Sequence, residues 1–514
     1  MAYIIGIDIG GTNTDAVVVD EKLQIVKSFK TPTTMPLECG VKKVLQDILD
    51  IKDIDSKDIK GINIGTTHAL NAILENQGLY RVGVIRIAGH NPMTLRPCFA
   101  WPKDIRENIF IGYETIDGGY ECDSREITPF NGRQAMKAVK NLIDKKAEGI
   151  AVVGVFSSIN NRQENICAEI IKDIAGEFFP VTLSHEIGGI GFIERENAAI
   201  LNVALKKPMK QGFCRLQKIK DQMGFDCPLF ITQNDGSLLD LFQAIKYPLL
   251  TISSGSTNSF IGTSKLLKEK EAVVIDVGGT STDIGVIKNG YPRRSMHNAN
   301  IGGITLNFRM PDVLTLALGG GSYITTGKNN NLFKIGPKSC GHRLFKESQV
   351  FGGKKLTLTD VAAMAGVLDI SNQAKNNFSI GITEAKEILD KVSLSIIKGI
   401  DLMRGEKKDL PVISVGGGAG IAFSCSTLTS DHAKVANAYG AALAEVSATI
   451  DTVVSLAKRE KILDDLKEKA INMAIAKGAK NQETRIVDVQ IVPYHYVPGR
   501  LARVIVIASG ALIS

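Results

Sequence analysis

Two copies of one octapeptide pattern, D-x-G-G-T-x-T-D, hold the residues of this chain that are best suited to chemistry. They run from Asp8 to Asp15 and from Asp276 to Asp283. A glycine turn of this kind exposes backbone N–H groups and threonine hydroxyls, which suit phosphate oxygens. A carboxylate just before the turn would repel a polyphosphate unless a divalent cation lay between them. We therefore expect Asp8 and Asp276 to be the catalytic carboxylates and to hold Mg²⁺, directly or through water.

The two turns and a third glycine cluster define the expected nucleotide site. The residues expected to cradle phosphates are Gly10, Gly11, Thr12, Thr14, Gly278, Gly279, Thr280 and Thr282. In the third cluster, Gly416, Gly417 and Gly418 follow an apolar strand and would let an adenosine lie flat against the backbone. A single such hairpin is often only a turn, but the duplication argues against that interpretation. For the loop 319–322, a functional role and a plain loop are equally supported.

The elements that must position these turns are buried hairpins. Tyr3–Ile9 and Ala272–Val277 are continuous apolar runs, typical of strands that are buried on both faces. Ala16–Val19 and Ile284–Ile287 would return as the second strands. In the first half, a strand, a helix, a further strand and a further helix are predicted over Gln24–Lys30, Leu37–Ile51, Lys60–Ile64 and Ala69–Gln77. This order is that of a ribonuclease-H-like α/β unit, and the repeat predicts that the unit is duplicated.

The patterns divide the chain into three expected domains. Residues 1–190 would form the first ribonuclease-H-like lobe, and residues 191–455 a helical connector, Phe192–Met223, followed by the second lobe. Residues 456–514 would form a small C-terminal αβ appendage with a helix over Ala457–Lys477 and strands over Thr484–Val492 and Leu501–Ser509.

Composition and charge exclude several classes of protein. The chain has 514 residues, of which 44% are hydrophobic and 22% charged, and this argues against a disordered or collagen-like protein. No apolar run approaches the ~18–20 residues needed to cross a bilayer, so no membrane association is expected. The net charge of +7 is dispersed and does not indicate nucleic-acid binding. The eight cysteines form no CxxC pair and the first residues contain no basic leader, so we expect a reduced, cytoplasmic protein.

The chain resembles the hydantoinase A/5-oxoprolinase family, a branch of the superfamily that contains sugar kinases, heat-shock-70 ATPases and actin. Beyond the octapeptides, Gly65–Gly78 is similar to the family's G-T-T-x-x-x-N-A segment, and Gln233–Gly236 to its Q-S-N-G-G stretch. Further similar segments are Leu318–Ser322, Ile335–Gly341, Leu356–Asp360, Val415–Gly420 and Asn437–Ala441. The resemblance covers residues 1–455 in order. One departure is the segment from His342 to Glu347, which replaces a proline-rich stretch of many members.

This resemblance implies an actin/hexokinase-type fold and ATP-dependent opening of a cyclic amide such as a hydantoin or 5-oxoproline. It implies ATP and Mg²⁺ as cofactors and a hydantoinase B-like subunit as a partner. The residues it places on the amide side of the cleft are Thr66, Thr67, Asn71, Gln233 and Asn234.

Three other functions stay open. The chain could be an ATP-dependent carboxylase subunit, a small-molecule kinase of the same fold, or a nucleotide-driven binding or regulatory module. A homo-oligomer is also open.

Overall fold

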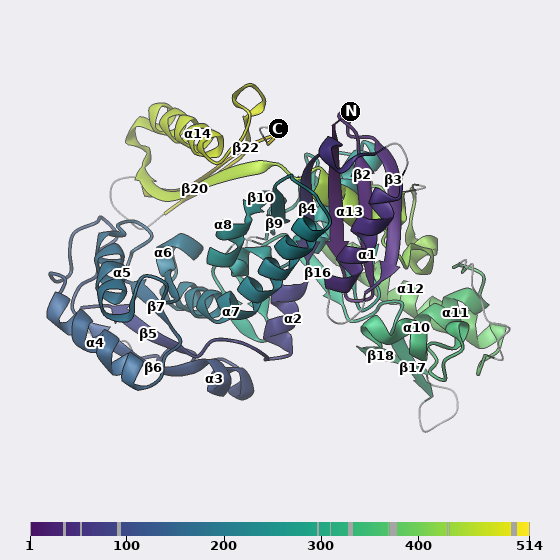
Figure 1. Ribbon diagram of the computed structural model, residues 1–514, viewed down its shortest axis with the longest axis horizontal. Helices are drawn as coiled ribbons and strands as arrows, with labels where there is room; N and C mark the ends of the chain where they lie inside the picture. Colours follow the sequence, from purple (N-terminus) through teal and green to yellow (C-terminus); the bar gives the residue numbers. More distant parts are fainter. Residues whose placement is uncertain are drawn as a thin grey trace.

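The computed structural model is an α/β protein whose described residues form six sheets of mixed type (Figure 1). It describes residues 2–33, 38–51, 54–89, 94–295, 298–308, 310–326, 333–368, 370, 378–428, 430, 432–494 and 501–512. No helix in these ranges is long and apolar enough to cross a membrane.

The first sheet holds the first octapeptide. Its strand order is β10-β9-β4-β1-β2-β3. The bounds are β1 Tyr3–Ile9, β2 Asn13–Val19, β3 Ile25–Pro32, β4 Ile59–Thr66, β9 Leu229–Thr232 and β10 Leu238–Asp240. β1 pairs antiparallel with β2, so that Asp8 lies opposite Asp15, and parallel with β4. The helices α1, Glu38–Leu49, and α2, His68–Leu74, complete the order predicted from the sequence, although Leu37 lies outside the described residues.

The second sheet repeats these strand relations around the second octapeptide. Its strands are β11 Ala272–Val277, β12 Thr282–Lys288, β13 Tyr291–Pro292, β16 Val313–Leu316 and β19 Val412–Val415. β11 pairs antiparallel with β12, which sets Asp276 opposite Asp283. β19 pairs parallel with β11, as β4 does with β1.

A separate parallel sheet is formed by residues that lie, in the sequence, between β4 and β9 of the first sheet. Its order is β6-β5-β7-β8, with β5 Val82–Ile87, β6 Phe110–Ile116, β7 Gly149–Gly154 and β8 Val181–Leu183. The helices α3, Lys103–Ile109, α4, Gly132–Asp144, and α5, Arg162–Ala175, belong to the same region, at the lower left of Figure 1. Apolar side chains of α4 and α5 form a core of their own with β5 and β7.

One long helix, α7, Phe192–Gln222, crosses the centre of the molecule and agrees with the helix predicted over Phe192–Met223. Most of its first half is buried, because it packs against β7, α1 and α2. Its charged residues Arg195 and Glu196 are buried as well; Glu196 forms a two-armed ion pair with Arg86 of β5, with N–O distances of 2.6 and 2.7 Å. This pair ties the parallel sheet to α7.

The C-terminal appendage is a three-stranded sheet covered on one face by a helix. Its order is β20-β22-β21, with β20 Val446–Ser455, β21 Arg485–Pro493, β22 Leu501–Gly510 and the helix α14 Arg459–Ala476. Figure 1 shows it at the top, above α6, Ser184–Ile187. The remaining named elements are α8 Leu241–Lys246, α9 Ser254–Leu267, β14 Ala299–Ile301, β15 Ile304–Leu306, β17 Ser322–Thr326, β18 Phe333–Ser339, α10 Leu344–Glu347, α11 Leu358–Met364, α12 Ile382–Arg404 and α13 Ala436–Ala442.

Strand pairing crosses the expected domain boundaries at two places. β9 and β10 lie beyond residue 191 but extend the first sheet, because β9 pairs with β4. β20 lies before residue 456 but pairs along its whole length with β22 of the appendage. An apolar run marks a strand but does not indicate which distant strand it will pair with, and this explains both differences.

Two short helices rich in small residues lie between the two sheets. Gly440 of α13 touches the backbone of Asn258 in α9 so closely that a Cβ would overlap the carbonyl oxygen of Asn258. Gly262 of α9 meets the backbone of Ala436 in the same way, and Gly6 of β1 meets Ala438. Glycine is needed at these crossings because any side chain would push the helices apart.

We expect Gly440→Ala to lower the free energy of unfolding by about 2 kcal/mol or more, because overpacking of a filled contact typically costs 1–3 kcal/mol. The measurement is urea-induced unfolding. Gly132→Ala is the matched control, since its Cβ would meet only Ile170 Cδ1 at 3.9 Å. Equal stability of the two variants would contradict this account of the helix crossing.

Candidate functional site

The turns of the two octapeptides lie directly against each other. A Cβ on Gly279 would overlap the side chain of Thr12, and a Cβ on Gly11 would lie 3.6 Å from Thr280 Cγ2. Thr12 is buried and Thr280 is exposed. The structure therefore brings the two predicted phosphate turns together from separate sheets.

Two of the predicted threonines lie behind the turns. The Thr14 hydroxyl lies 3.2 Å from that of Thr33, and the Thr282 hydroxyl donates to the carbonyl of Leu318 at 2.6 Å. Both side chains are fully buried. These two hydroxyls are thus used within the protein, where they fix the shape of the turns.

The loop 319–322 supports the second turn from behind. The backbone N–H of Gly320 donates to Gly278 O at 3.0 Å, and that of Gly321 donates to Gly279 O at 2.7 Å. A Cβ on Gly319 would lie 2.6 Å from the backbone of Thr280. Of the two interpretations left open by the sequence, this geometry favours a loop that shapes the turn.

The carboxylates before the turns are buried and close enough to affect each other. Asp8 and Asp276 are 5% and 7% exposed. Burial, the charge of Asp15 and the charge of Asp276 raise the pKa of Asp8 to about 7. Burial and the charges of Asp283 and Asp15 raise the pKa of Asp276 to about 7. The amide of Asn437 in α13 donates to Asp8 Oδ2 at 3.4 Å and also lowers the pKa of Asp276, so it lies between the two carboxylates.

The second carboxylate of each octapeptide has different partners in the two sheets. Asp15 accepts from Lys30 Nζ at 2.8 and 3.0 Å. Asp283 accepts instead from the hydroxyls of Ser256 and Thr315, at 2.5 and 2.8 Å. Burial raises the pKa of both. Lys30 is thus the cation that partly offsets the negative charge of this cluster from the first sheet.

Several buried oxygen atoms around the two turns have no hydrogen-bond partner within the described residues. They are Asp8 Oδ1, Thr12 Oγ1, Ser254 Oγ, Asn258 Oδ1 and Asn437 Oδ1. Buried polar atoms without partners are rare, because each costs free energy that a ligand or ion can recover. Carboxylate and amide oxygens are the ligands that Mg²⁺ prefers, so these residues fit a hydrated Mg²⁺. No three His, Cys, Asp or Glu side chains in the described ranges converge on one metal position, so amide oxygens, phosphates or water would complete the coordination.

The third glycine cluster lies beside the second carboxylate. A Cβ on Gly416, whose φ is +88°, would overlap Asp276 Oδ1, and Gly418 N donates to Val277 O at 2.9 Å. A Cβ on Gly417 would lie 3.5 Å from Lys30 Nζ. The predicted adenosine residues therefore adjoin both the second turn and Lys30 of the first sheet.

The residues expected on the amide side separate into two groups. Thr66 ends β4 beside Ile9 of β1, Thr67 Oγ1 donates to Ile9 O at 3.4 Å, and Asn71 Nδ2 lies 3.5 Å from Thr67 Oγ1. These three adjoin the first turn. Gln233 and Asn234 instead lie in the turn between β9 and β10.

Gln233 Nε2 donates to the Ser237 hydroxyl at 2.6 Å, and Asn234 lines a cavity on which neither glycine turn opens. A role of these two residues on the amide side stays a prediction.

Sequence reasoning missed the start of α9. A Cβ on Gly255 would lie 3.7 Å from Asp8 Oδ1, and Ser256 and Asn258 join the cluster through Asp283 and Thr232. The segment from Ser253 to Ser259 has no apolar periodicity, so nothing in its pattern marked a buried helix. Asn437 lies within a segment that matched the family pattern, and this was the available signal for it.

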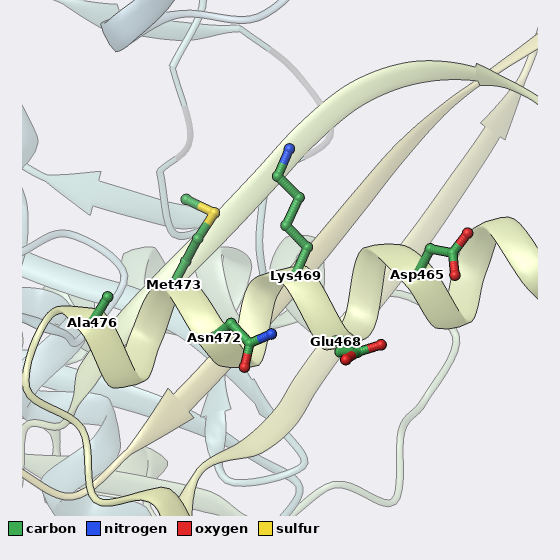
Figure 2. Close-up of a pocket in the computed structure, with 6 residues that line it drawn as sticks. All are labelled: Asp465, Glu468, Lys469, Asn472, Met473 and Ala476. Atoms are coloured by element: carbon green, nitrogen blue, oxygen red, sulfur yellow. The ribbon is translucent and has the colours of Figure 1, made fainter.

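A shallow surface hollow of about 420 Å³ lies elsewhere on the molecule. Figure 2 shows the six side chains that line it. Its lining residues all come from α14: Asp465, Glu468, Lys469, Asn472, Met473 and Ala476. It contains none of the predicted site residues and is the solvated face of one helix.

Comparison with known families identifies the chain. The model of the Hydantoinase/oxoprolinase N-terminal region matches residues 4–175, and the Hydantoinase/oxoprolinase model matches residues 195–379. The chain belongs to the hydantoinase/oxoprolinase family.

Named relatives in this family have more than one activity. The acetophenone carboxylase gamma subunit of Aromatoleum aromaticum is 26% identical over 71% of this chain and 53% of its own length. The caprolactamase subunit alpha of Pseudomonas jessenii is 25% identical over 82% of this chain and 66% of its own length. The 5-oxoprolinase 1 of Arabidopsis thaliana is 26% identical over 64% of this chain and 28% of its own length. The chain thus spans about half the length of the first of these relatives.

Two solved structures share the fold. The ATP-dependent caprolactamase of Pseudomonas jessenii has a TM-score of 0.77 and 20% identity, covering 99% of this chain and 87% of that chain. A nucleotide-free acetone carboxylase has a TM-score of 0.73 and 16% identity, covering 99% and 88%.

The raised pKa values predict how stability depends on pH. An aspartate of the unfolded chain titrates near 3.8, whereas Asp8 and Asp276 titrate near 7 in the folded protein. The folded state therefore binds more protons between these values, and raising the pH from 4 to 7 lowers the free energy of unfolding.

We expect Asp8→Asn to remove part of this dependence of the free energy of unfolding on pH. Without Mg²⁺ or nucleotide, the variant should be more stable than the wild type at pH 8 by about 1–3 kcal/mol and nearly equal to it at pH 4. Urea unfolding at both pH values tests this, with the exposed Asp144→Asn as control. A pH-independent effect of Asp8→Asn would contradict it.

Proposed function

We propose that the chain is the nucleotide-using component of an enzyme that opens a cyclic amide at the expense of ATP. The observation that supports this most strongly is the opposition of the two glycine turns, each preceded by a buried aspartate. Buried oxygens without partners surround this point, as expected of a site built for a cation and phosphates. Relatives named as a caprolactamase subunit and a 5-oxoprolinase favour the same class of substrate.

In this proposal each side of the site has a defined task. Asp8 and Asp276 hold Mg²⁺ and are the catalytic carboxylates. The backbone of Gly10, Gly11, Gly278 and Gly279 and the hydroxyls of Thr12 and Thr280 receive the phosphates, and Gly416–Gly418 the adenosine. The matching strand relations of the two sheets support a duplicated ribonuclease-H-like unit as their origin.

The amide would lie against the other side of the first turn. Thr66, Thr67 and Asn71 offer hydroxyl and amide groups there, next to Asp8. An amide carbonyl is a poor electrophile, and ATP would supply the phosphoryl group that makes its oxygen a leaving group. The residues around it position the reactants and offset charge, which are the main tasks of a protein in phosphoryl transfer. Two of the relatives are named as subunits, so we propose a B-type partner for the hydrolytic half.

A carboxylase subunit is the second candidate, because an acetophenone carboxylase subunit is among the relatives. A solved structure with the same fold is an ATP-dependent acetone carboxylase, so the nucleotide site described above would suit either reaction. A small-molecule kinase and a regulatory module stay as alternatives that the assays below separate.

Replacement of either turn aspartate should abolish most turnover. We expect Asp8→Asn and Asp276→Asn each to lower Mg-ATP hydrolysis by about 10²–10³-fold, the typical effect of removing one group that stabilises charge in the transition state. The measurement is phosphate release at saturating ATP, with Asp144→Asn as the control. Wild-type rates in both variants would refute the metal role.

The substrate class can be tested with a panel of cyclic amides. Phosphate release should rise with 5-oxoproline, a hydantoin or a lactam when a B-type subunit is present, with ring-opened product in equal amount. Stimulation only by a ketone with bicarbonate would favour the carboxylase. A phosphorylated product without ring opening would favour the kinase, and stimulation only by a peptide or by self-assembly the regulatory module.

A further inference from the structure

A cavity of about 400 Å³ lies where the first sheet, the second sheet and the C-terminal appendage meet. Its walls come from the turn between β9 and β10, the second half of α9, the segment from β12 through β13, and the strands β21 and β22. Its volume is within the usual range for sites of small molecules, about 300–1,000 Å³. Of the described residues that line it, none belongs to the two glycine turns. It is therefore a separate feature from the nucleotide site.

Of the positive groups that line this cavity, Arg293 forms an ion pair with Asp312 at 2.7 Å, whereas Arg294, Lys265 and Lys288 form none within the described residues. Arg294 is partly buried, and its Nη1 atom is buried without a hydrogen-bond partner in the described part of the chain. Lys265 of α9 and Lys288 of β12 are exposed on the same wall and form no ion pair within the described residues. A guanidinium nitrogen can only donate hydrogen bonds. Burying it without an acceptor therefore costs free energy.

The negative groups of the cavity are already bound to donors of the protein. Glu445 accepts from Arg485 at 3.1 Å and from the Ser509 hydroxyl at 2.8 Å. Asp488 accepts from Gln490 at 2.7 Å, and Asp235 from the Ser237 hydroxyl at 2.6 Å. Hydrogen bonds from neutral groups leave the carboxylate charges in place, but the described lining carries four cations, Lys265, Lys288, Arg293 and Arg294, against the three carboxylates. One positive charge is thus in excess, and a ligand with a negative group would balance it.

The rest of the wall includes apolar side chains. Ile261 of α9, Met310, Leu443 and Ile507 of β22 line the cavity beside the polar groups. Such a wall favours a ligand with a hydrocarbon body over a bare inorganic ion, because it removes apolar surface from water.

From these observations we infer that the cavity binds a small organic anion, with a carboxylate or phosphate group at Arg294 and an apolar body against Ile261 and Ile507. Nucleotide is not needed for this binding, and the inference does not depend on the proposed reaction. Bound there, the ligand would touch both sheets and the appendage at once.

The test uses three probes with the same six-carbon body. Hexanoate and hexyl phosphate carry the two anionic groups, and hexanamide is the neutral control. Calorimetric titration of the full chain without nucleotide should show one site for at least one anion, with hexanamide at least 10-fold weaker. The anion that binds more tightly identifies the head group. Failure of both anions to bind at millimolar concentration would overturn the inference.

Variants locate the bound probe. Arg294→Gln should weaken anion binding at least 10-fold, whereas Arg125→Gln, which removes the same charge from an exposed site, should leave it unchanged. The double variant Lys265→Gln/Lys288→Gln should weaken binding as well and alters only exposed side chains, so it gives an answer even if Arg294→Gln does not fold. Wild-type affinity in these variants, or displacement of the probe by Mg-ATP, would place the probe elsewhere and overturn the inference.

Discussion

The close contact of the two glycine turns governs the chemistry of this molecule. Each turn follows a strand that carries an aspartate two residues before the first glycine, so contact between the turns brings Asp8 and Asp276 into one buried space. Neither carboxylate can be well solvated there. Burial and the charges of nearby aspartates raise the pKa of both. The folded chain therefore holds an electrostatic cost that a divalent cation would relieve.

The packing of α9 and α13 behind the turns holds the two buried carboxylates close together. α9 and α13 cross at glycines, with no side chain between their backbones, and both contact the first sheet. α13 brings Asn437 between the two aspartates, and α9 begins beside Asp8 and binds Asp283 through Ser256. Helices that approach so closely have little room to shift, so the carboxylates cannot move apart to lower their repulsion without disturbing the core. The small residues of these helices thus allow the close packing that positions Asn437 and Ser256 at the aspartates.

The sequence predicted the local elements well and their long-range partners less well. The strands of both hairpins and the helices α1, α7 and α14 agree with the expected ranges within a few residues, because buried apolar runs and amphipathic spacing are local signals. Both turns and the third glycine cluster lie together as expected. The place of β9 in the first sheet could not be predicted from pattern alone, since its pairing with β4 is decided by an open sheet edge far away in the sequence. The role of the start of α9 was hidden because the residues buried in its first turns are serine, threonine and asparagine.

The most direct test of this account is a crystal structure of the protein with Mg²⁺ and a non-hydrolysable ATP analogue. The account predicts that the triphosphate lies between the turns of Gly10–Thr12 and Gly278–Thr280, with Mg²⁺ near Asp8 and Asp276. A triphosphate bound at any other place, or contacts with only one of the two turns, would contradict it.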